Sequence, residues 1–123
     1  MTALTIYPED NRVTTSQNKL GITHFEEYLG NRVIPFSSAR AAMIFPLKRI
    51  ANQGTEEIFI PRYLSQCVTS ALGKAILPAR RPSEATRAIL VYHQYGYPQR
   101  LDLIEQEASL NGWTIVNNCV NAM

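Results

Sequence analysis

The side chains best placed to bind a ligand are two serines and an arginine, Ser37, Ser38 and Arg40, at the predicted start of a helix. Serine is a favoured N-cap, because its hydroxyl accepts a hydrogen bond from a backbone amide of the first turn. The amides and the dipole at such a helix start also favour an anion. Two interpretations of Arg40 stay open: it contacts a bound phosphate, or it is a solvated residue of the first turn. A small-anion binder is therefore one candidate function.

The other nucleophilic and metal-binding side chains are few and scattered. Cys67 and Cys119 lie in separate segments without CxxC spacing, and two histidines, His24 and His93, are too few for an obvious zinc site. We expect both cysteines to be buried, reduced thiols. His93 follows a predicted buried strand, where a hydrogen-bonded core residue and a titrating acid or base are both open. We assign no metal site and no catalytic residue.

The composition limits the class of protein. The chain has 123 residues, of which 46% are hydrophobic and 18% charged, and its 12 basic and 10 acidic residues give a formal net charge of +2. Such a chain is long enough to bury a core of its own. The charges are spread along the chain, so no basic patch for binding nucleic acid is predicted. No secretory signal and no membrane span is recognisable. We therefore expect a cytoplasmic protein without nucleic-acid or membrane partners.

Strands and helices are predicted to alternate along most of the chain. Residues 1–22 lack periodicity and are expected to form an extended or partly ordered N-terminal arm, followed by a single α/β domain over 23–123. Strands are expected at 32–36, 57–61, 75–77, 87–92 and 113–116, and helices at 23–30, 39–50, 65–72 and 99–111. This alternation predicts a three-layer α/β/α fold with a mostly parallel sheet.

The last predicted helix is apolar on two sides. Leu101, Ile104 and Ala108 form the face expected to contact the sheet, whereas Leu103 and Leu110 lie together on the opposite side. Either these two leucines are singly exposed, which is common, or they form a second contact surface. We also expect an uncovered sheet edge near the C-terminus, where pairing with another chain would favour a dimer.

Five stretches of sequence follow one another in a characteristic order: FEEYLG at 25–30, SSARAA at 37–42, IFIPRY at 58–63, LVYHQYGYP at 90–98 and WTIVNNCVNA at 113–122. In this order they resemble the first half of the large domain of the DegT/StrS-type sugar aminotransferases, a family of fold type I pyridoxal-phosphate (PLP) enzymes. The resemblance covers residues 23–123 and implies part of the PLP-dependent transferase fold.

The resemblance also implies which positions would contact PLP. The family's phosphate loop falls on Ser38, Ala39 and Arg40, the acid that pairs with the pyridine nitrogen falls on Asn118, and a position beside the ring oxygen falls on Asn121. A carboxylate holds the ring nitrogen protonated, whereas the neutral amide of Asn118 supplies no counter-charge. We therefore expect the chain to lack the charged group that lets PLP act as an electron sink.

The family's Schiff-base lysine lies beyond the last matching stretch, whereas this chain ends at Met123. None of Lys19, Lys48 and Lys74 falls at a position that the resemblance makes catalytic. Covalent capture of PLP then has no nucleophile. We expect no covalently attached cofactor, and PLP binding is implied by the resemblance alone.

These observations leave three candidate functions. We expect a truncated, non-catalytic aminotransferase-like module for assembly or interaction, in a homo-oligomer or with a related aminotransferase chain. The alternatives are a subunit of a PLP-dependent aminotransferase that a partner chain completes, and a small phosphate- or anion-binding protein that uses the Ser37–Arg40 turn. We do not expect the chain to be an active enzyme alone.

Overall fold

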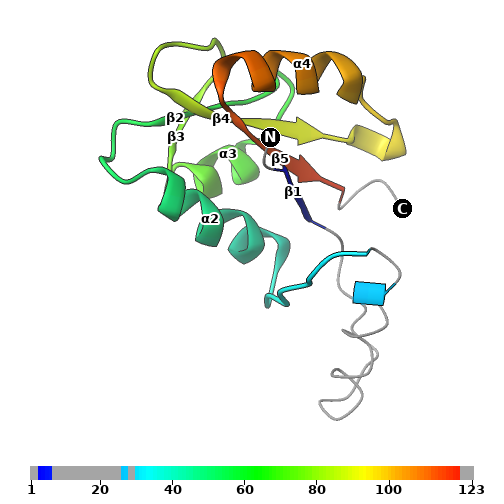
Figure 1. Ribbon diagram of the computed structural model, residues 1–123. Coiled ribbons are helices and arrows are strands. Elements are labelled where there is room, and N and C mark those ends of the chain that lie inside the picture. The colour runs from blue at the N-terminus through cyan, green and yellow to red at the C-terminus, as the bar shows by residue number, and fades with distance from the viewer. Residues whose placement is uncertain (1–2, 7–25, 28–29, 120–123) are drawn as a thin grey trace.

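One parallel sheet between two helix layers forms the fold. The computed structural model describes residues 3–6, 26–27 and 30–119. The strands are β1 (Ala3–Ile6), β2 (Glu57–Phe59), β3 (Leu77–Ala79), β4 (Thr86–Tyr92) and β5 (Thr114–Asn118), and the helices are α2 (Ala39–Ile50), α3 (Gln66–Leu72) and α4 (Leu101–Asn111), with a 3-10 turn η1 at Gln94–Gly96. The strand order is β1-β5-β4-β2-β3, and every neighbouring pair is parallel. Figure 1 shows α4 on one face of the sheet, with α2 and α3 on the other. The predicted three-layer α/β/α fold is confirmed.

The central strand β4 is buried on both faces, as its nearly continuous apolar sequence predicts. Because successive side chains of a strand alternate between faces, Ala88 and Leu90 pack in the cluster under α2 and α3. Ile89 and Val91 pack on the other face, against Ala108 of α4. Each large apolar side chain buried in this way contributes roughly 1.5–3 kcal/mol to stability. Residues 86–92 therefore hold the two helix layers together.

Helix α2 begins at the predicted cap. Ser38 Oγ accepts a hydrogen bond from the Ala41 amide at 3.1 Å, and the helix continues through Pro46 to Ile50. Its inward side chains Met43 and Leu47 are almost fully buried in the cluster above the sheet. The cap and this apolar stripe together orient the first turn of α2 at one end of the sheet.

Helix α4 also ends where the sequence predicts. Gly112 has φ +68°, a left-handed conformation that glycine adopts without strain and that turns the chain into β5. Leu101 and Ile104 pack partly buried beside Ala108, so the predicted inward face is confirmed. Leu103 and Leu110 are exposed on the outer side.

The N-terminal edge of the sheet differs from the prediction. Residues 3–6, within the expected arm of 1–22, form β1 and pair with β5 from Ala3 and Ile115 to Ile6 and Asn118. The sheet therefore begins before residue 23, where we placed the start of the domain. The uncovered edge expected at the last strand is also wrong, because β1 supplies backbone partners to the outer side of β5. The edge strands are β1 and β3.

Two other predicted strands are corrected. Residues 32–36 form no strand: the Val33 amide donates to Glu26 Oε1 at 2.9 Å, and Pro35 has no amide to donate to a sheet. The short strand expected at 75–77 lies at Leu77–Ala79. It includes Pro78, which is tolerated because β3 is an edge strand. The expected capping residue Thr23 lies outside the described residues.

Candidate functional site

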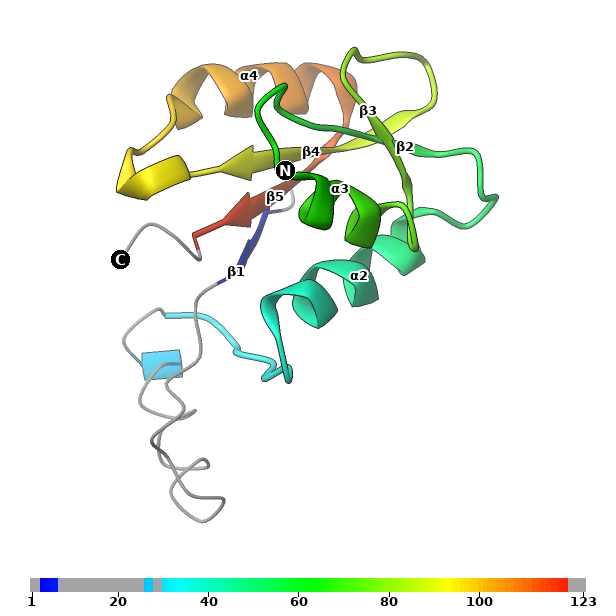
Figure 2. The ribbon, with the colours of Figure 1, turned by 180° about the vertical axis from the view of Figure 1, so that it is seen from behind.

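The carboxyl edge of a parallel sheet is where ligand sites usually form. Connections between parallel strands must run back, so the helices begin at this edge. Ligands of open α/β sheets bind there, at the point where the strand order reverses. In this chain the reversal lies between β2 and β4, which lead to helices on opposite faces, α3 and α4 (Figure 2). The positions implied by the resemblance are therefore judged by what surrounds them at this edge.

The implied phosphate-loop residues stand at the start of α2. Ser38 is the cap, and Ala39 and Arg40 are the first two helical residues. Ala39 packs against the buried cluster, whereas the Arg40 side chain is exposed. Asn118 is the last residue of β5, and Asn121 lies outside the described residues. The helix start and the end of β5 are thus both at the carboxyl edge.

Asn118 belongs to the core at that edge. It is 3% exposed, and its Nδ2 donates to Met43 Sδ at 3.6 Å. A thioether sulfur is a weak acceptor. Met43 lies in the second turn of α2, so Asn118 contacts the inner side of the helix whose first turn carries Ser38 and Arg40. Its side chain is therefore engaged with the core of the fold.

His93 links the ends of β4 and β5 to the chain that enters α4. Its Nε2 lies 2.5 Å from Asn117 Oδ1, and its Nδ1 accepts a hydrogen bond from the Gln99 amide at 3.2 Å. Because Nδ1 is an acceptor, Nε2 carries the hydrogen and donates it to Asn117. The ring is 6% exposed. Of the two interpretations left open for His93, the hydrogen-bonded core residue is the one that the structure supports.

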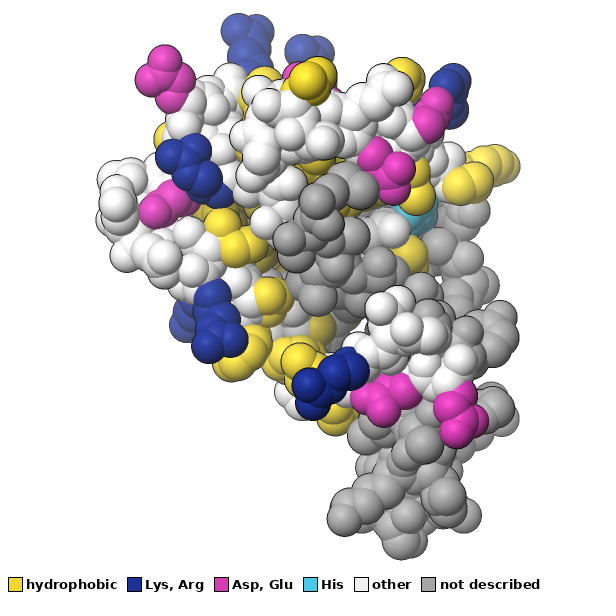
Figure 3. All heavy atoms as spheres, in the orientation of Figure 1, with side chains coloured by type: hydrophobic (Ala, Val, Ile, Leu, Met, Phe, Trp, Pro, Cys, Tyr) yellow, Lys and Arg dark blue, Asp and Glu magenta, His cyan; other side chains and the backbone are white. Residues whose placement is uncertain are grey.

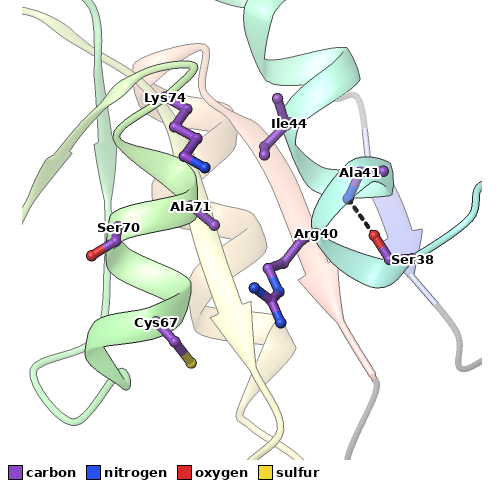
Figure 4. A pocket seen from close by; sticks show the side chains of 8 residues that line it. All are labelled: Ser38, Arg40, Ala41, Ile44, Cys67, Ser70, Ala71 and Lys74. Atoms are coloured by element: carbon purple, nitrogen blue, oxygen red, sulfur yellow. Dashed lines mark hydrogen bonds between the residues drawn. The ribbon is translucent and has the colours of Figure 1, made fainter.

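A groove of about 450 Å³ lies between α2 and α3. Figure 4 shows the residues that line it: Ser38, Arg40, Ala41, Ile44, Cys67, Ser70, Ala71 and Lys74. Arg40 from α2 and Lys74, just after α3, both extend into the space between the helices. Asn118 is not among the lining residues. The implied phosphate and ring-nitrogen positions therefore do not share this groove.

Half of this groove was missed by the sequence reasoning. The α2 side contains the predicted Ser38 and Arg40, but the α3 side had not been assigned a role. The sequence does contain a pattern that could have indicated it: Cys67, Ser70 and Lys74 are spaced three and four residues apart, which places them on one face of a helix. That spacing does not show whether the face is covered by a neighbouring helix.

The two cysteines occupy contrasting environments. Neither is in a disulfide; Cys67 is exposed in the groove and Cys119 is partly buried. The Ser65 hydroxyl, 3.2 Å from Cys67 Sγ, is the main cause that lowers the pKa of the Cys67 thiol, and the charge of Arg40 adds to it. Burial raises the pKa of Cys119. The expectation of two buried thiols is wrong for Cys67, because its side of α3 faces the groove.

In residues 3–6, 26–27 and 30–119, no three potential metal ligands come together. The helices of the same residues are all too short or too polar to cross a membrane.

Comparison with known proteins gives no additional evidence about the function. Protein-family models, curated proteins and solved structures were compared with this chain, and none of them matches it.

Proposed function

We propose that this chain is a non-catalytic aminotransferase-like domain that assembles with a second copy of itself. The observation that carries the proposal is the environment of Asn118. Where the resemblance implies an acid beside a pyridine nitrogen, the chain has a neutral amide that is 3% exposed and donates to Met43 Sδ. An amide cannot supply the counter-charge that makes the ring an electron sink.

The position of the lysines supports the same proposal. Lys48 lies in the last turn of α2, and Lys74 follows the end of α3. Both helices run against the direction of the strands, so their last turns lie at the amino edge of the sheet. Asn118 ends β5 at the opposite edge. An amine that acts on a bound ring must lie within contact distance of the reacting atom, and neither lysine begins at the edge where Asn118 lies.

Assembly is supported by the incomplete cover of the sheet face that carries α4. Leu77 of β3 pairs with Glu57, two residues before Phe59, so Leu77 and Phe59 lie on the same face. Phe59 packs in the α4 cluster, whereas Leu77 is 49% exposed. Parallel sheets are normally covered on both faces. A second copy that packs here would complete the cover.

The outer side of α4 adds to this apolar surface. Leu110 is 85% exposed and Leu103 is 56% exposed, one above the other on the helix. Figure 3 shows hydrophobic side chains at the surface over α4, between charged ones. Exposed leucines grouped on one helix face favour a contact surface over scattered single exposure.

The absence of catalysis is tested by incubating the chain with PLP and an amino-acid donor and measuring the keto acid formed. We expect none above a reaction without protein. The Asn118→Asp variant, tested in parallel, should be equally inactive, because Lys48 and Lys74, the lysines of the described residues, lie towards the opposite edge of the sheet from residue 118. Transfer of amino groups by the unmodified chain alone would overturn the proposal.

Assembly is tested by sedimentation velocity over a wide range of protein concentration. We expect the mean mass to rise towards that of a dimer, and the Leu103→Lys, Leu110→Lys double variant to shift that rise to higher concentration. A matched control, Glu105→Gln with Ser109→Lys, adds the same charge at other exposed positions of α4. A monomer at every concentration, or equal effects of both double variants, would contradict the proposal.

A further inference from the structure

The two cationic side chains of the α2–α3 groove form no ion pair with other described residues of the chain. Within the described residues, neither Arg40 nor Lys74 takes part in an ion pair, whereas Arg100 pairs with Asp102. The residues that line the groove include no aspartate or glutamate. Two cations therefore enter one concave surface that contains no carboxylate of its own.

The two cations approach from different helices. Arg40 comes from the first turn of α2 and Lys74 from the end of α3, and Figure 4 shows both extending between the helices. A guanidinium presents a planar fork that matches phosphate or carboxylate oxygens, and an ammonium adds a compact second charge. Ser38 and Ser70 are the other polar residues of the lining, but the Ser38 hydroxyl caps α2 and the Ser70 hydroxyl points away from α2 in Figure 4, so the two cations are the main polar groups of the groove. The polar part of the groove is therefore suited to an anionic group.

The remaining lining is apolar. Ala41 and Ile44 belong to α2, and the buried Ala71 belongs to α3. Small-molecule sites are commonly about 300–1,000 Å³ and combine apolar walls with a few polar groups, and the groove of about 450 Å³ has both properties. An inorganic anion would leave these apolar side chains without a contact, whereas an organic anion would cover them.

We propose that the α2–α3 groove binds a small organic anion, with a phosphate or carboxylate group on Arg40, an apolar body packed on Ile44 and Ala71, and Lys74 adding positive charge towards the other end of the groove. Phosphate esters and carboxylates share the chemistry that this groove recognises. The inference goes beyond the proposed function, because Ser70, Ala71 and Lys74 lie outside the five stretches that resemble the aminotransferases. It can hold whether or not the chain assembles.

The test is a titration of the ¹⁵N-labelled full chain with phenyl phosphate, followed by NMR. We expect saturable shifts of amide signals in the first turn of α2 and along α3. Benzoate should produce the same pattern if carboxylates are also accepted, and no benzoate response would restrict the class to phosphates. Inorganic phosphate should bind more weakly than phenyl phosphate, since it lacks the apolar body.

Variants locate the binding. Arg40→Gln and Lys74→Gln should each weaken phenyl phosphate binding by about threefold, and the double variant by about tenfold, as expected for exposed charge pairs. Ile44→Ser should weaken phenyl phosphate and leave inorganic phosphate unchanged. The matched control is Lys48→Gln, which removes an exposed cation from α2 outside the groove and should leave the affinity nearly unchanged.

Cys67 provides a readout that needs no variant. Its thiol lines the groove, so saturating phenyl phosphate should slow its alkylation by the neutral reagent iodoacetamide, while Cys119 should react at an unchanged rate. The proposal is overturned if phenyl phosphate gives no saturable shifts, if the double variant binds as tightly as the original chain, or if Lys48→Gln weakens binding as much as Lys74→Gln.

Discussion

The carboxyl ends of β4 and β5 and the α2–α3 groove use their polar side chains in different ways. At the strand ends, His93 is hydrogen-bonded to Asn117 and to the Gln99 amide, and Asn118 donates to Met43. In the groove, Arg40 and Lys74 extend between two helices without an ion pair in the described part of the chain. Polar groups bonded within a core contribute to stability, whereas exposed charges contribute little to it and remain available to a ligand. The resemblance implies a ring-nitrogen partner at the strand ends and a phosphate loop at residues 38–40, and we propose that ligand recognition takes place in the groove that Ser38 and Arg40 line.

The largest expected effect comes from placing a charge at the strand ends. Asn118→Asp converts a buried donor into a carboxylate beside the Met43 sulfur. Burial of a carboxylate is costly, so we expect a loss of about 3 kcal/mol in the free energy of unfolding at pH 7. Urea denaturation, followed by circular dichroism, measures this change.

The pH dependence of this loss identifies its cause. Burial would raise the pKa of the new carboxyl in the folded state above the value of about 3.9 in the unfolded chain. The difference from the original chain should therefore be full above the folded pKa and should vanish below about pH 3.9. Asn52→Asp, at an exposed turn, is the control and should change stability by less than about 0.5 kcal/mol. A loss that stays constant with pH would show that charge burial is not the reason.

The next effect in size comes from the histidine that joins β4, β5 and the start of α4. His93→Ala leaves Asn117 Oδ1 and the Gln99 amide without the ring that bonds them, and we expect a loss of about 2 kcal/mol. Lys74→Gln, in the groove, should change stability by less than about 0.5 kcal/mol. Equal losses in the two variants would remove the contrast between a region that stabilises and a region that is available for binding.

The parts of the fold that the sequence predicted are those with a strong local signal. α2 and α4 have a cap or a terminal glycine together with a periodic apolar face, and β4 is a long apolar run. By contrast, β1 has four residues and gains its partner from β5, more than a hundred positions along the chain. No local pattern encodes such a pairing. The strand expected at 32–36 had β-forming residues but has no sheet neighbour in the structure.

The candidate site was predictable to a similar extent. The serines and arginine at 37–40 indicated a capped helix with anion-binding potential, and Ser38 does cap α2. The contribution of α3 depends on how closely two helices pack, which is a property of the tertiary structure. The sequence also could not show that Asn118 would face Met43, because those residues are 75 positions apart.

A smaller effect distinguishes the two helices that form the groove. Ser38 Oγ accepts a hydrogen bond from the Ala41 amide, whereas the Ser65 side chain makes no capping bond on α3 and lies beside Cys67 instead. Ser38→Ala should therefore cost about 1 kcal/mol. Ser65→Ala should cost clearly less, and chemical denaturation of both variants measures the difference. If the two substitutions lower the free energy of unfolding equally, the capping hydrogen bond of Ser38 does not contribute to the stability of the protein.

The smallest perturbation compares the two thiols without changing the fold. The Ser65 hydroxyl lowers the pKa of Cys67, with smaller effects in the same direction from the Val68 backbone amide and the Arg40 charge, whereas burial raises the pKa of Cys119. Since the thiolate is the nucleophile, the rate of alkylation by iodoacetamide should rise with pH at Cys67 first and at Cys119 only at higher pH. Mass spectrometry of the two peptides at each pH measures the two rates in a single sample. Ser65→Ala should move the Cys67 profile to higher pH and leave that of Cys119 in place. Greater exposure alone would raise the alkylation rate of Cys67 by the same factor at every pH. A lower midpoint of the pH profile of Cys67 would therefore show that the groove stabilises the negative charge of the thiolate, and is not only open to solvent.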